Sequence, residues 1–419
     1  MGLTVIEKII QNHTQQEVSP GKIVWMDLDV RSARDFGGPN VVKNFQREYG
    51  DKTVEDSKKT FFTFDLSVPA CSIKYADNQQ ICRQFARKKG IKVYDVDEGI
   101  GSHVLIEKGH ASSGSTVVGT DSHMNILGAV GSFGQGMGDV DITFAFKTGK
   151  TWFEVPETIK VILEGEFKHP SSAKDLTLFI LKKLGTRTAA LKAVEFAGPA
   201  ARNLSLSERI TLCSMVTEMA GIVGFVPEVN DGFIQEMKNL TGTDYQPVQA
   251  DPEAQYAEEV KINISGLPPQ AAAPSQPTNV KNVKDLSDVP IDSGFIGSCT
   301  NGRIEDLKAA ADVLRGRMVK PGVMLRIAPA TRKVYSEMIK RGILEDLFES
   351  GAVIRNPGCS GCAEGHIGLT GEGETQISTG NRNFAGKQGK GNNYLASPQV
   401  VAASCVLGRI ASPEELYNE

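Results

Sequence analysis

The sequence lacks the features that would place it in a membrane or outside the cell. No apolar run approaches the roughly twenty residues that a membrane-spanning helix needs, and the start, MGLTVIEKIIQNH, has no basic segment followed by an apolar core. An excess of positive charge is also missing, because 46 Lys and Arg face 50 Asp and Glu, for a formal charge of −4. We therefore expect a cytoplasmic protein with no membrane and no nucleic-acid partner.

The chain also lacks the dense, even set of cysteines that holds small secreted domains together. It has seven cysteines in 419 residues, which does not suggest a disulfide framework. Four of them have apolar or helical neighbours, and we expect these to be buried, unreactive thiols: Cys71, Cys82, Cys213 and Cys405. The other three, Cys299, Cys359 and Cys362, have unusual neighbours and need another explanation.

Apolar segments alternate with amphipathic ones along most of the chain. This rhythm predicts an α/β protein with several parallel strands. In the first quarter, we expect strands within 22–30, 59–68 and 91–96 and a helix within 76–90. A glycine-rich stretch around 128–138 follows the polar DSH motif; it lets backbones approach closely, but its spacing matches no phosphate-binding or dinucleotide fingerprint.

The composition changes near residue 265, where Pro, Ala, Gln and Ser become frequent. This is typical of a linker, so we expect two interleaved domains in 1–264, a linker over 265–288 and a last domain over 289–419. The last domain again alternates strands with helices, and one helix is predicted over 332–351.

The three unusual cysteines follow predicted strands of this last domain. Cys299 ends one strand, and Cys359 and Cys362 end another, at turns where open α/β sheets place ligands. Three alternatives stay open on these residues alone. A zinc site needs four ligands and would take His366 as the fourth, whereas a redox pair leaves Cys299 unexplained. An iron–sulfur cluster held by three cysteines would leave one iron open to substrate.

Several motifs, taken in chain order, resemble the aconitase superfamily. They are VVGTDSH…GAVGSFGQGMGDVD, GSCTNGRIEDLKAAA, NPGCSGC…GH, STGNRNFAGKQG and YLASPQVVAAS. The resemblance covers essentially the whole chain and is strongest to the family's large subunits of 3-isopropylmalate dehydratase and homoaconitase, in their short archaeal and bacterial form. It implies three-layer α/β/α domains around a central cluster cleft, without the family's swivelling domain.

The resemblance implies a [4Fe-4S] cluster ligated by Cys299, Cys359 and Cys362, whose fourth iron binds a substrate hydroxyl and carboxylate. Asn301 would lie against this cluster. The matches to the family's substrate-binding residues are Ser122, Asn381 and Arg382, and the matches to its catalytic residues are Asp65, Asp121 and His123. An arginine fork suits a carboxylate because it donates two parallel hydrogen bonds.

The chain departs from the family pattern where histidines are usual. Leu66 and Ser102 replace two of them, which leaves His123 and the neighbouring His103 as candidate proton carriers. Arg34 replaces a third and is a candidate anchor for an extra anionic group of the substrate. Lys387 stands where arginine is usual, which keeps the charge and loses the fork.

The implied function is an iron–sulfur hydro-lyase that acts on a small hydroxy di- or tricarboxylate such as 3-isopropylmalate or homocitrate/homoaconitate. The chain stops at ASPEELYNE, about where the tether of the swivelling domain would begin, so we expect a small swivel-domain subunit as partner. The lost histidines favour two alternatives: a hydratase of another 2-hydroxy acid, of citraconate or dimethylmaleate type, or a cluster-binding relative without catalysis. A zinc-stabilised interaction protein is a third.

Overall fold

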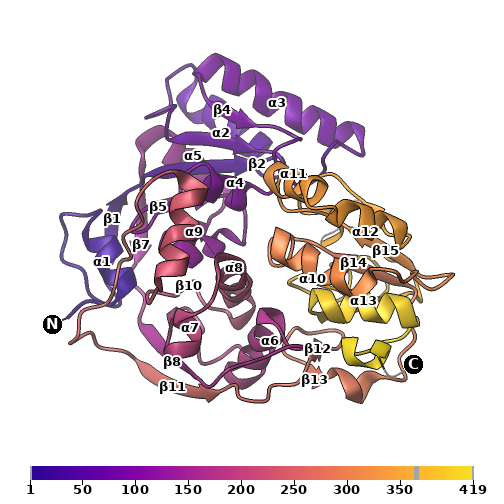
Figure 1. Cartoon of the computed structure of the whole chain (residues 1–419). Coiled ribbons are helices and arrows are strands. Elements are labelled where there is room, and N and C mark those ends of the chain that lie inside the picture. Colours follow the sequence, from indigo (N-terminus) through magenta and orange to yellow (C-terminus); the bar gives the residue numbers. More distant parts are fainter. Residues whose placement is uncertain (1, 363–367, 418–419) are drawn as a thin grey trace.

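The computed structural model describes residues 2–362 and 368–417. Its strands and helices gather into units that follow one another along the sequence and lie around a shared centre (Figure 1). Most neighbouring strands are parallel, which confirms the predicted α/β class. None of the helices in the described ranges combines the length and apolar character that crossing a membrane requires.

The first unit is built on a parallel sheet with the strand order β4-β3-β2-β5-β6. Its strands are β2 (Val30–Arg34), β3 (Thr60–Thr63), β4 (Lys92–Tyr94), β5 (Thr116–Gly119) and β6 (Phe133–Gly136). Its helices are α2 (Gly38–Tyr49), α3 (Ile73–Lys89), α4 (Gly101–Glu107), the 3₁₀ helix η1 (Met124–Val130) and α5 (Asp139–Thr148). Beside it lie α1 (Val5–Gln11) and an antiparallel ribbon of β1 (Ile23–Asp27) and β7 (Lys150–Glu154).

The second unit has the parallel order β10-β9-β8-β11. Its strands are β8 (Thr158–Glu164), β9 (Ala193–Ala197), β10 (Val223–Phe225) and β11 (Glu258–Asn263). Its helices are α6 (Ala173–Leu184), α7 (Pro199–Arg202), α8 (Leu206–Ser214), η2 (Met215–Met219) and α9 (Asp231–Thr241).

The third unit has the strand order β13-β12-β18-β17-β14-β15-β16. Its strands are β12 (Gln270–Ala272), β13 (Val280–Asn282), β14 (Ser293–Ile296), β15 (Met324–Ile327), β16 (Val353–Ile354), β17 (Thr375–Ser378) and β18 (Asn392–Ala396). Its helices are η3 (Val283–Leu286), α10 (Ile304–Leu314), α11 (Arg332–Lys340), α12 (Ile343–Glu349), η4 (Ser360–Cys362), α13 (Pro398–Leu407) and η5 (Pro413–Tyr417).

Three expected segments differ from the structure. The segment 265–288, expected to be a linker, contributes β12 and β13 to the edge of the third sheet, where a short antiparallel pair tolerates its prolines. The strand expected over 22–30 divides into β1 and β2, which join different sheets. The helix expected over 332–351 divides into α11 and α12, because Gly342 adopts a left-handed φ of 70° between them.

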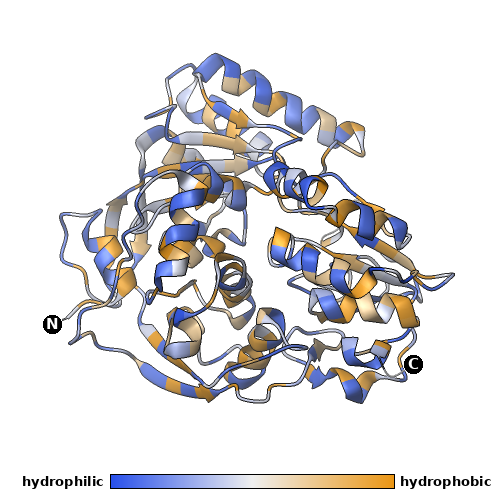
Figure 2. Cartoon of the chain, viewed as in Figure 1, coloured by the Kyte–Doolittle hydropathy of each residue, from blue (hydrophilic) through white to orange (hydrophobic). Residues whose placement is uncertain are grey.

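The sequence predicted the long peripheral helix α3 well. It begins after Ser72, whose hydroxyl accepts a hydrogen bond from the backbone N–H of Tyr75, and it ends at Gly90 in the left-handed conformation. Figure 2 shows α3 as mostly hydrophilic with hydrophobic residues interspersed, and its buried residues include Cys82, Phe85 and Ala86.

The first and third sheets each reverse their strand order at one point. In the first sheet the chain builds outward from β2 through β3 to β4 on one side and through β5 to β6 on the other. In the third sheet the same reversal lies between β14 and β17. Such switch points open a crevice at the carboxyl ends of the strands, and these ends carry the side chains described in the next subsection.

We expect the aromatic core of the first unit to be a large contributor to stability. The Phe62 ring is fully buried and lies 5.8 Å from the ring of Phe146 and 6.3 Å from that of Phe85, centroid to centroid. Phe62→Ala should lower the free energy of unfolding by about 3–5 kcal/mol, measured by urea denaturation. Phe36→Ala is the matched control, because that side chain is 65% exposed; equal losses from both variants would contradict the prediction.

Candidate active site

Arg34, the last residue of β2, lies at the centre of a buried ionic cluster. Its Nε donates to Asp65 Oδ1 at 2.8 Å, and its Nη1 lies 3.0 Å from Asp121 Oδ1. Its Nη2 donates to Cys359 Sγ at 3.0 Å. Asp65 and Asp121 follow β3 and β5, whereas Cys359 follows β16 in the third unit. The carboxyl ends of the two sheets therefore face each other across this guanidinium.

Burial and charge act against each other in this cluster. Burial opposes the charge of Arg34, but Asp121 and Asp65 outweigh it and raise the arginine's pKa. Burial raises the pKa of Asp65, assisted by Asp35 and Asp121 and opposed by Arg34. The pKa of Asp121 is lowered: burial opposes ionisation, but Arg34 and His123 outweigh it. Asp65 is thus the carboxyl of the pair that holds a proton more readily.

Asp35 holds the turn that carries Asp65 and Leu66. Its carboxylate accepts hydrogen bonds from the backbone N–H groups of Asp65 (3.3 Å), Leu66 (3.1 Å) and Ser67 (3.3 Å), and from the side chain of Gln79 (3.1 Å). Several donors on one carboxylate fix its position firmly. The Leu66 side chain is partly buried and packs against the hydrophobic cluster that includes Cys299 and Cys359.

Close backbone approaches at two glycines position the functional turns. A Cβ at Gly136 of β6 would collide with the carbonyl oxygen of Asp121, so the turn carrying Asp121 depends on this glycine. A Cβ at Gly358 would lie 2.9 Å from the carbonyl oxygen of Asp65, which accepts the backbone N–H of Cys359. Gly136 belongs to the glycine-rich stretch, where the sequence predicted such close backbone approaches.

The three cysteines singled out from the sequence come together. Cys299 and Cys359 are buried and Cys362 is half-buried. A hydrogen bond with Cys362, together with burial, raises the pKa of Cys359, and the same bond lowers the pKa of Cys362. Burial raises the pKa of Cys299, and the charges of Asp121 and Cys362 add to that effect. Each of the three thiols is therefore close enough to another of them to change its pKa or to have its own pKa changed by it.

The backbone beside two of these cysteines is strained. Ser298 has a φ of 68° and Ser360 a φ of 48°, the left-handed region that residues with a Cβ seldom adopt. Such conformations persist only where the surrounding structure holds them, and they gather at functional sites. Ser298 precedes Cys299, and Ser360 follows Cys359.

The donor set suits a multi-iron cluster. Across residues 2–362 and 368–417, no group of three or more His, Cys, Asp and Glu side chains converges as ligands of one metal ion would. A cluster makes a different demand, because each cysteine binds a different iron. His366, the fourth ligand of the zinc alternative, lies outside the described residues.

Asn381 supplies an observation that tests this fit. Its Oδ1 lies 3.5 Å from Cys299 Sγ, and its buried Nδ2 has no hydrogen-bond partner among the described residues. A buried donor left over beside a thiol is costly unless another acceptor meets it. A sulfide-rich anionic group held by the three cysteines would provide that acceptor, so the residues present fit the group.

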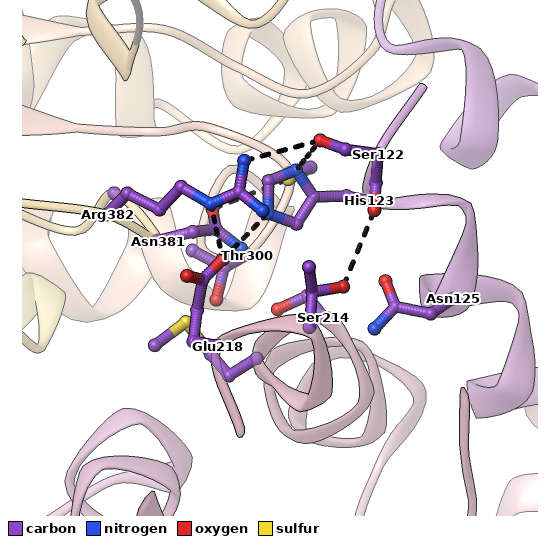
Figure 3. Close-up of polar contacts among 12 residues, drawn as sticks. Ser122, His123, Asn125, Ser214, Glu218, Thr300, Asn381 and Arg382 are labelled. Carbon is purple, nitrogen blue, oxygen red and sulfur yellow. Dashed lines mark hydrogen bonds and ion pairs between the residues drawn. The ribbon is translucent and has the colours of Figure 1, made fainter. Parts of the chain in front are cut away.

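Glu218 of η2 joins His123 to Arg382. Its Oε1 accepts Arg382 Nε at 2.8 Å and lies 3.2 Å from His123 Nε2. The hydroxyl of Ser122 lies 3.5 Å from both His123 Nδ1 and Arg382 Nη1. Figure 3 shows the side chains of His123 and Arg382 directed to Glu218 from different elements. The three units therefore contribute to one site.

His103 contacts the backbone of the turn that carries Cys299. It is fully buried on α4, and its Nε2 donates to the carbonyl oxygen of Cys299 at 2.9 Å. Burial, with the charge of Arg303, lowers the pKa of His103 to about 4. This geometry favours a neutral ring that holds the Cys299 turn, and the catalytic role of His103 stays a prediction.

Two further predicted residues lie near the thiols. Asn301 is buried, and its Nδ2 donates to Asp306 Oδ1 at 2.9 Å and to Thr211 Oγ1 at 3.2 Å. Lys387 is partly exposed in the loop between β17 and β18, and its charge contributes to the lowered pKa of Cys362. Their roles toward cluster and substrate stay predictions.

One expectation about the remaining cysteines is wrong. Cys82, Cys213 and Cys405 are buried as expected, but Cys71 is exposed. It lies in the turn before α3, where the Ser67 hydroxyl donates to its sulfur at 3.2 Å. Its apolar sequence neighbours did not reveal that this turn faces solvent.

Sequence reasoning missed Glu218 and Asp35. Glu218 stands in MVTEMAG, which has no motif, and only the fold brings it beside Arg382. Asp35 directly follows Arg34, so the pair of opposite charges after a predicted strand was a usable signal.

An α/β fold whose sheets bring thiols, arginines and a histidine to their strand ends is typical of an enzyme with its active site at that edge. The profile of the aconitase family (aconitate hydratase) matches residues 7–288 and 280–408. The chain is 42% identical over 416 residues to the 3-isopropylmalate dehydratase large subunit 1 of Methanopyrus kandleri, with 99% of each chain covered. It is 38% identical to the 3-isopropylmalate dehydratase large subunit of Moorella thermoacetica, with 100% of both chains covered.

Among solved structures, the crystal structure of Thermococcus kodakaraensis aconitase X (holo-form) resembles the fold. The TM-score is 0.50 at 14% identity, with 86% of this chain and 84% of that chain covered. The chain therefore belongs to the aconitase family, as the sequence motifs predicted, and the predicted class of a hydro-lyase of this family is confirmed.

The Arg34 cluster yields a stability prediction. Arg34→Met would leave Asp65 and Asp121 buried without their counter-charge, so it should lower the free energy of unfolding by about 3–5 kcal/mol, measured by urea denaturation at pH 7. Arg315→Met is the control, because Arg315 is 58% exposed in its pair with Asp346, and the loss there should be much smaller. Similar losses from the two variants would refute a central role for Arg34.

Proposed function

We propose that this chain is the large subunit of an iron–sulfur hydro-lyase that acts on a small hydroxy di- or tricarboxylate, of the 3-isopropylmalate or homocitrate/homoaconitate type. The observation that carries the proposal is the meeting of Cys299, Cys359 and Cys362 with His123 and Arg382 at one site. The names of the relatives, 3-isopropylmalate dehydratase large subunit, support the substrate type.

The three cysteines would hold a [4Fe-4S] cluster. When bound, such a cluster supplies a Lewis acid that polarises a hydroxyl or carboxylate oxygen. Arg34 donates to the sulfur of Cys359 and Lys387 contributes positive charge near Cys362, and both charges favour sulfur in its thiolate form.

Arg382 is the proposed anchor for a substrate carboxylate. Glu218 accepts from its Nε, which orients the guanidinium and leaves its other edge for two parallel hydrogen bonds. Ser122 and Asn381 lie beside this fork and would take further polar groups of the substrate. Arg34 is less free, because a substrate group would have to compete with Asp121 for Nη1.

His123 is the proposed proton carrier. Its Nε2 faces Glu218 and its Nδ1 faces Ser122, so a proton can be held at either nitrogen in a fixed ring orientation. Asp65 is the second candidate, because its raised pKa lets it stay protonated at higher pH than an ordinary aspartate. Both groups belong to turns that the glycines and Asp35 hold in place.

Leu66 favours a second candidate substrate. It packs against the hydrophobic cluster that includes Cys299 and Cys359, at a position where the resemblance leads one to expect a histidine, and it can neither donate nor accept a proton. An apolar wall at this point suits a substrate with an alkyl group near the reacting carbons. Hydration of a citraconate- or dimethylmaleate-type acid is therefore the alternative function.

A small swivel-domain subunit is the proposed partner. The relatives are named as large subunits, and the resemblance locates the family's α-proton base on the swivelling domain. The purified chain alone should therefore show little activity.

The deciding experiment reconstitutes the chain anaerobically with iron and sulfide, together with a small swivel-domain subunit from the same organism. Hydroxy acids of both types are then screened by the absorbance of the conjugated product. We expect about four irons per chain and turnover of at least one substrate only when both subunits are present. Zinc without iron, or full activity of the isolated chain, would overturn the proposal.

Glu218→Gln tests the link between the carboxylate anchor and the proton carrier. Removing the charge weakens the hold on both Arg382 and His123, so kcat/KM should fall by about 10²-fold or more. Glu228→Gln is the control, because the Glu228 carboxylate forms its ion pair with the exposed Arg202. Unchanged kinetics in the Glu218 variant, with normal iron content, would exclude this role.

A further inference from the structure

Lys174 is a fully buried lysine that the proposed chemistry does not use. It is the second residue of α6 in the second unit, and it is among the largest side chains with essentially no exposed surface. Burying an ammonium group is expensive unless its hydrogen bonds and charge are met. The position therefore calls for a physical reason.

The ammonium group binds the third unit through backbone oxygens. Its Nζ donates to the carbonyl oxygens of Thr379 at 3.0 Å and Gly380 at 2.9 Å, and Met215 Sδ lies 3.9 Å away. No carboxylate in the described part of the chain forms an ion pair with it. Thr379 and Gly380 directly follow β17 and directly precede Asn381 and Arg382. Lys174 therefore holds the base of the turn that carries the proposed carboxylate anchor.

The same turn is bonded to the Cys299 turn. Thr379 Oγ1 accepts the backbone N–H of Gly297 at 2.9 Å and donates to the Gly297 carbonyl at 3.0 Å. Asn381 Oδ1 completes the contact at Cys299 Sγ, at 3.5 Å. Hydrogen bonds and short stretches of backbone thus connect Lys174 across the switch point of the third sheet to the Cys299 turn.

Asp175, which follows Lys174, adds a second contact between α6 and the third unit. Asp175 Oδ1 accepts the backbone N–H of Gln270, the first residue of β12, at 2.7 Å. Consecutive residues of α6 therefore contact the turn after β17 and the strand β12 of the third sheet, and Figure 1 shows α6 beside β12. The first residues of α6 therefore connect the second unit to the third.

Electrostatics agrees with this geometry. Burial lowers the pKa of Lys174 to about 7, and the nearby charges of Cys299, Asp306 and Glu218 act in the opposite direction.

We propose that Lys174 is a positioning residue of the active site: by holding the Thr379–Gly380 carbonyls it sets the Asn381–Arg382 turn and the Cys299 turn against each other. The part of this inference that concerns substrate rests on the proposed function. The part that concerns Cys299 does not, because it follows from contacts within the protein.

The test compares Lys174→Met, Lys174→Gln and Lys182→Met. Methionine keeps the length of the side chain and removes its donors, whereas glutamine keeps a donor for the carbonyls. Lys182 is the matched control, because it is an exposed lysine on the same helix. Iodoacetamide alkylation of the metal-free protein is followed by mass spectrometry, and the rate at Cys299 is divided by the rate at buried Cys405.

The alkylation ratio should rise about tenfold in Lys174→Met and a few-fold in Lys174→Gln, because opening of the Cys299 turn becomes easier. It should not change in Lys182→Met. If Lys174→Met fails to fold, the Lys174→Gln ratio decides, and a wild-type value there overturns the proposal. A ratio that rises equally in the Lys182 variant overturns it as well.

A kinetic readout extends the test to the proposed enzyme. With the cluster and partner in place, Lys174→Gln should raise KM and lower kcat. The factor by which KM rises should be about ten times the factor by which kcat falls, because Arg382 is displaced as a carboxylate anchor. A tenfold fall of kcat with an unchanged KM would contradict the role of Lys174 in positioning Arg382. Because alkylation needs neither cluster nor substrate, failure of the proposed function leaves the Cys299 result standing.

Discussion

The site depends on one buried guanidinium, that of Arg34. It connects the carboxylates that follow β3 and β5 with the sulfur of Cys359, which belongs to a different unit of the chain. Isolated, each of these groups would be costly to bury, and together they satisfy one another. The close approach of the first and third units at this point makes the strand ends face each other, and that juxtaposition turns two ordinary open sheets into one site.

The second unit acts on the site through backbone and carboxylate contacts. Glu218 orients Arg382 and His123, while Lys174 holds the turn on which Arg382 is mounted. Neither residue was accessible to sequence reasoning, because each stands in a helix without a motif and meets partners that are 95 to 206 residues away in the sequence. The strands, the long helix α3 and the three cysteines were predictable, since periodicity and strand-end chemistry are local properties of the sequence.

The errors of the sequence analysis have the same origin. Residues 265–288 have the composition of a linker, yet their backbone pairs at the edge of a sheet, where prolines do little harm. A single left-handed glycine, Gly342, divides a segment whose periodicity alone predicts one helix. Cys71 was expected in a core and lies in an exposed turn. In each case the three-dimensional neighbours, rather than local preference, decide the outcome.

Charge pairing within the site constrains what it can bind. Arg34 is committed to Asp65 and Asp121, and Arg382 shares its Nε with Glu218, so neither is a free cation in the described part of the chain. A dicarboxylate of the proposed type would therefore meet one open edge of a guanidinium and the partly exposed Lys387. Leu66, which packs against the hydrophobic cluster that includes two of the thiols, can exchange no proton with it. Recognition of the second carboxylate of such a substrate would therefore fall to groups outside this cluster.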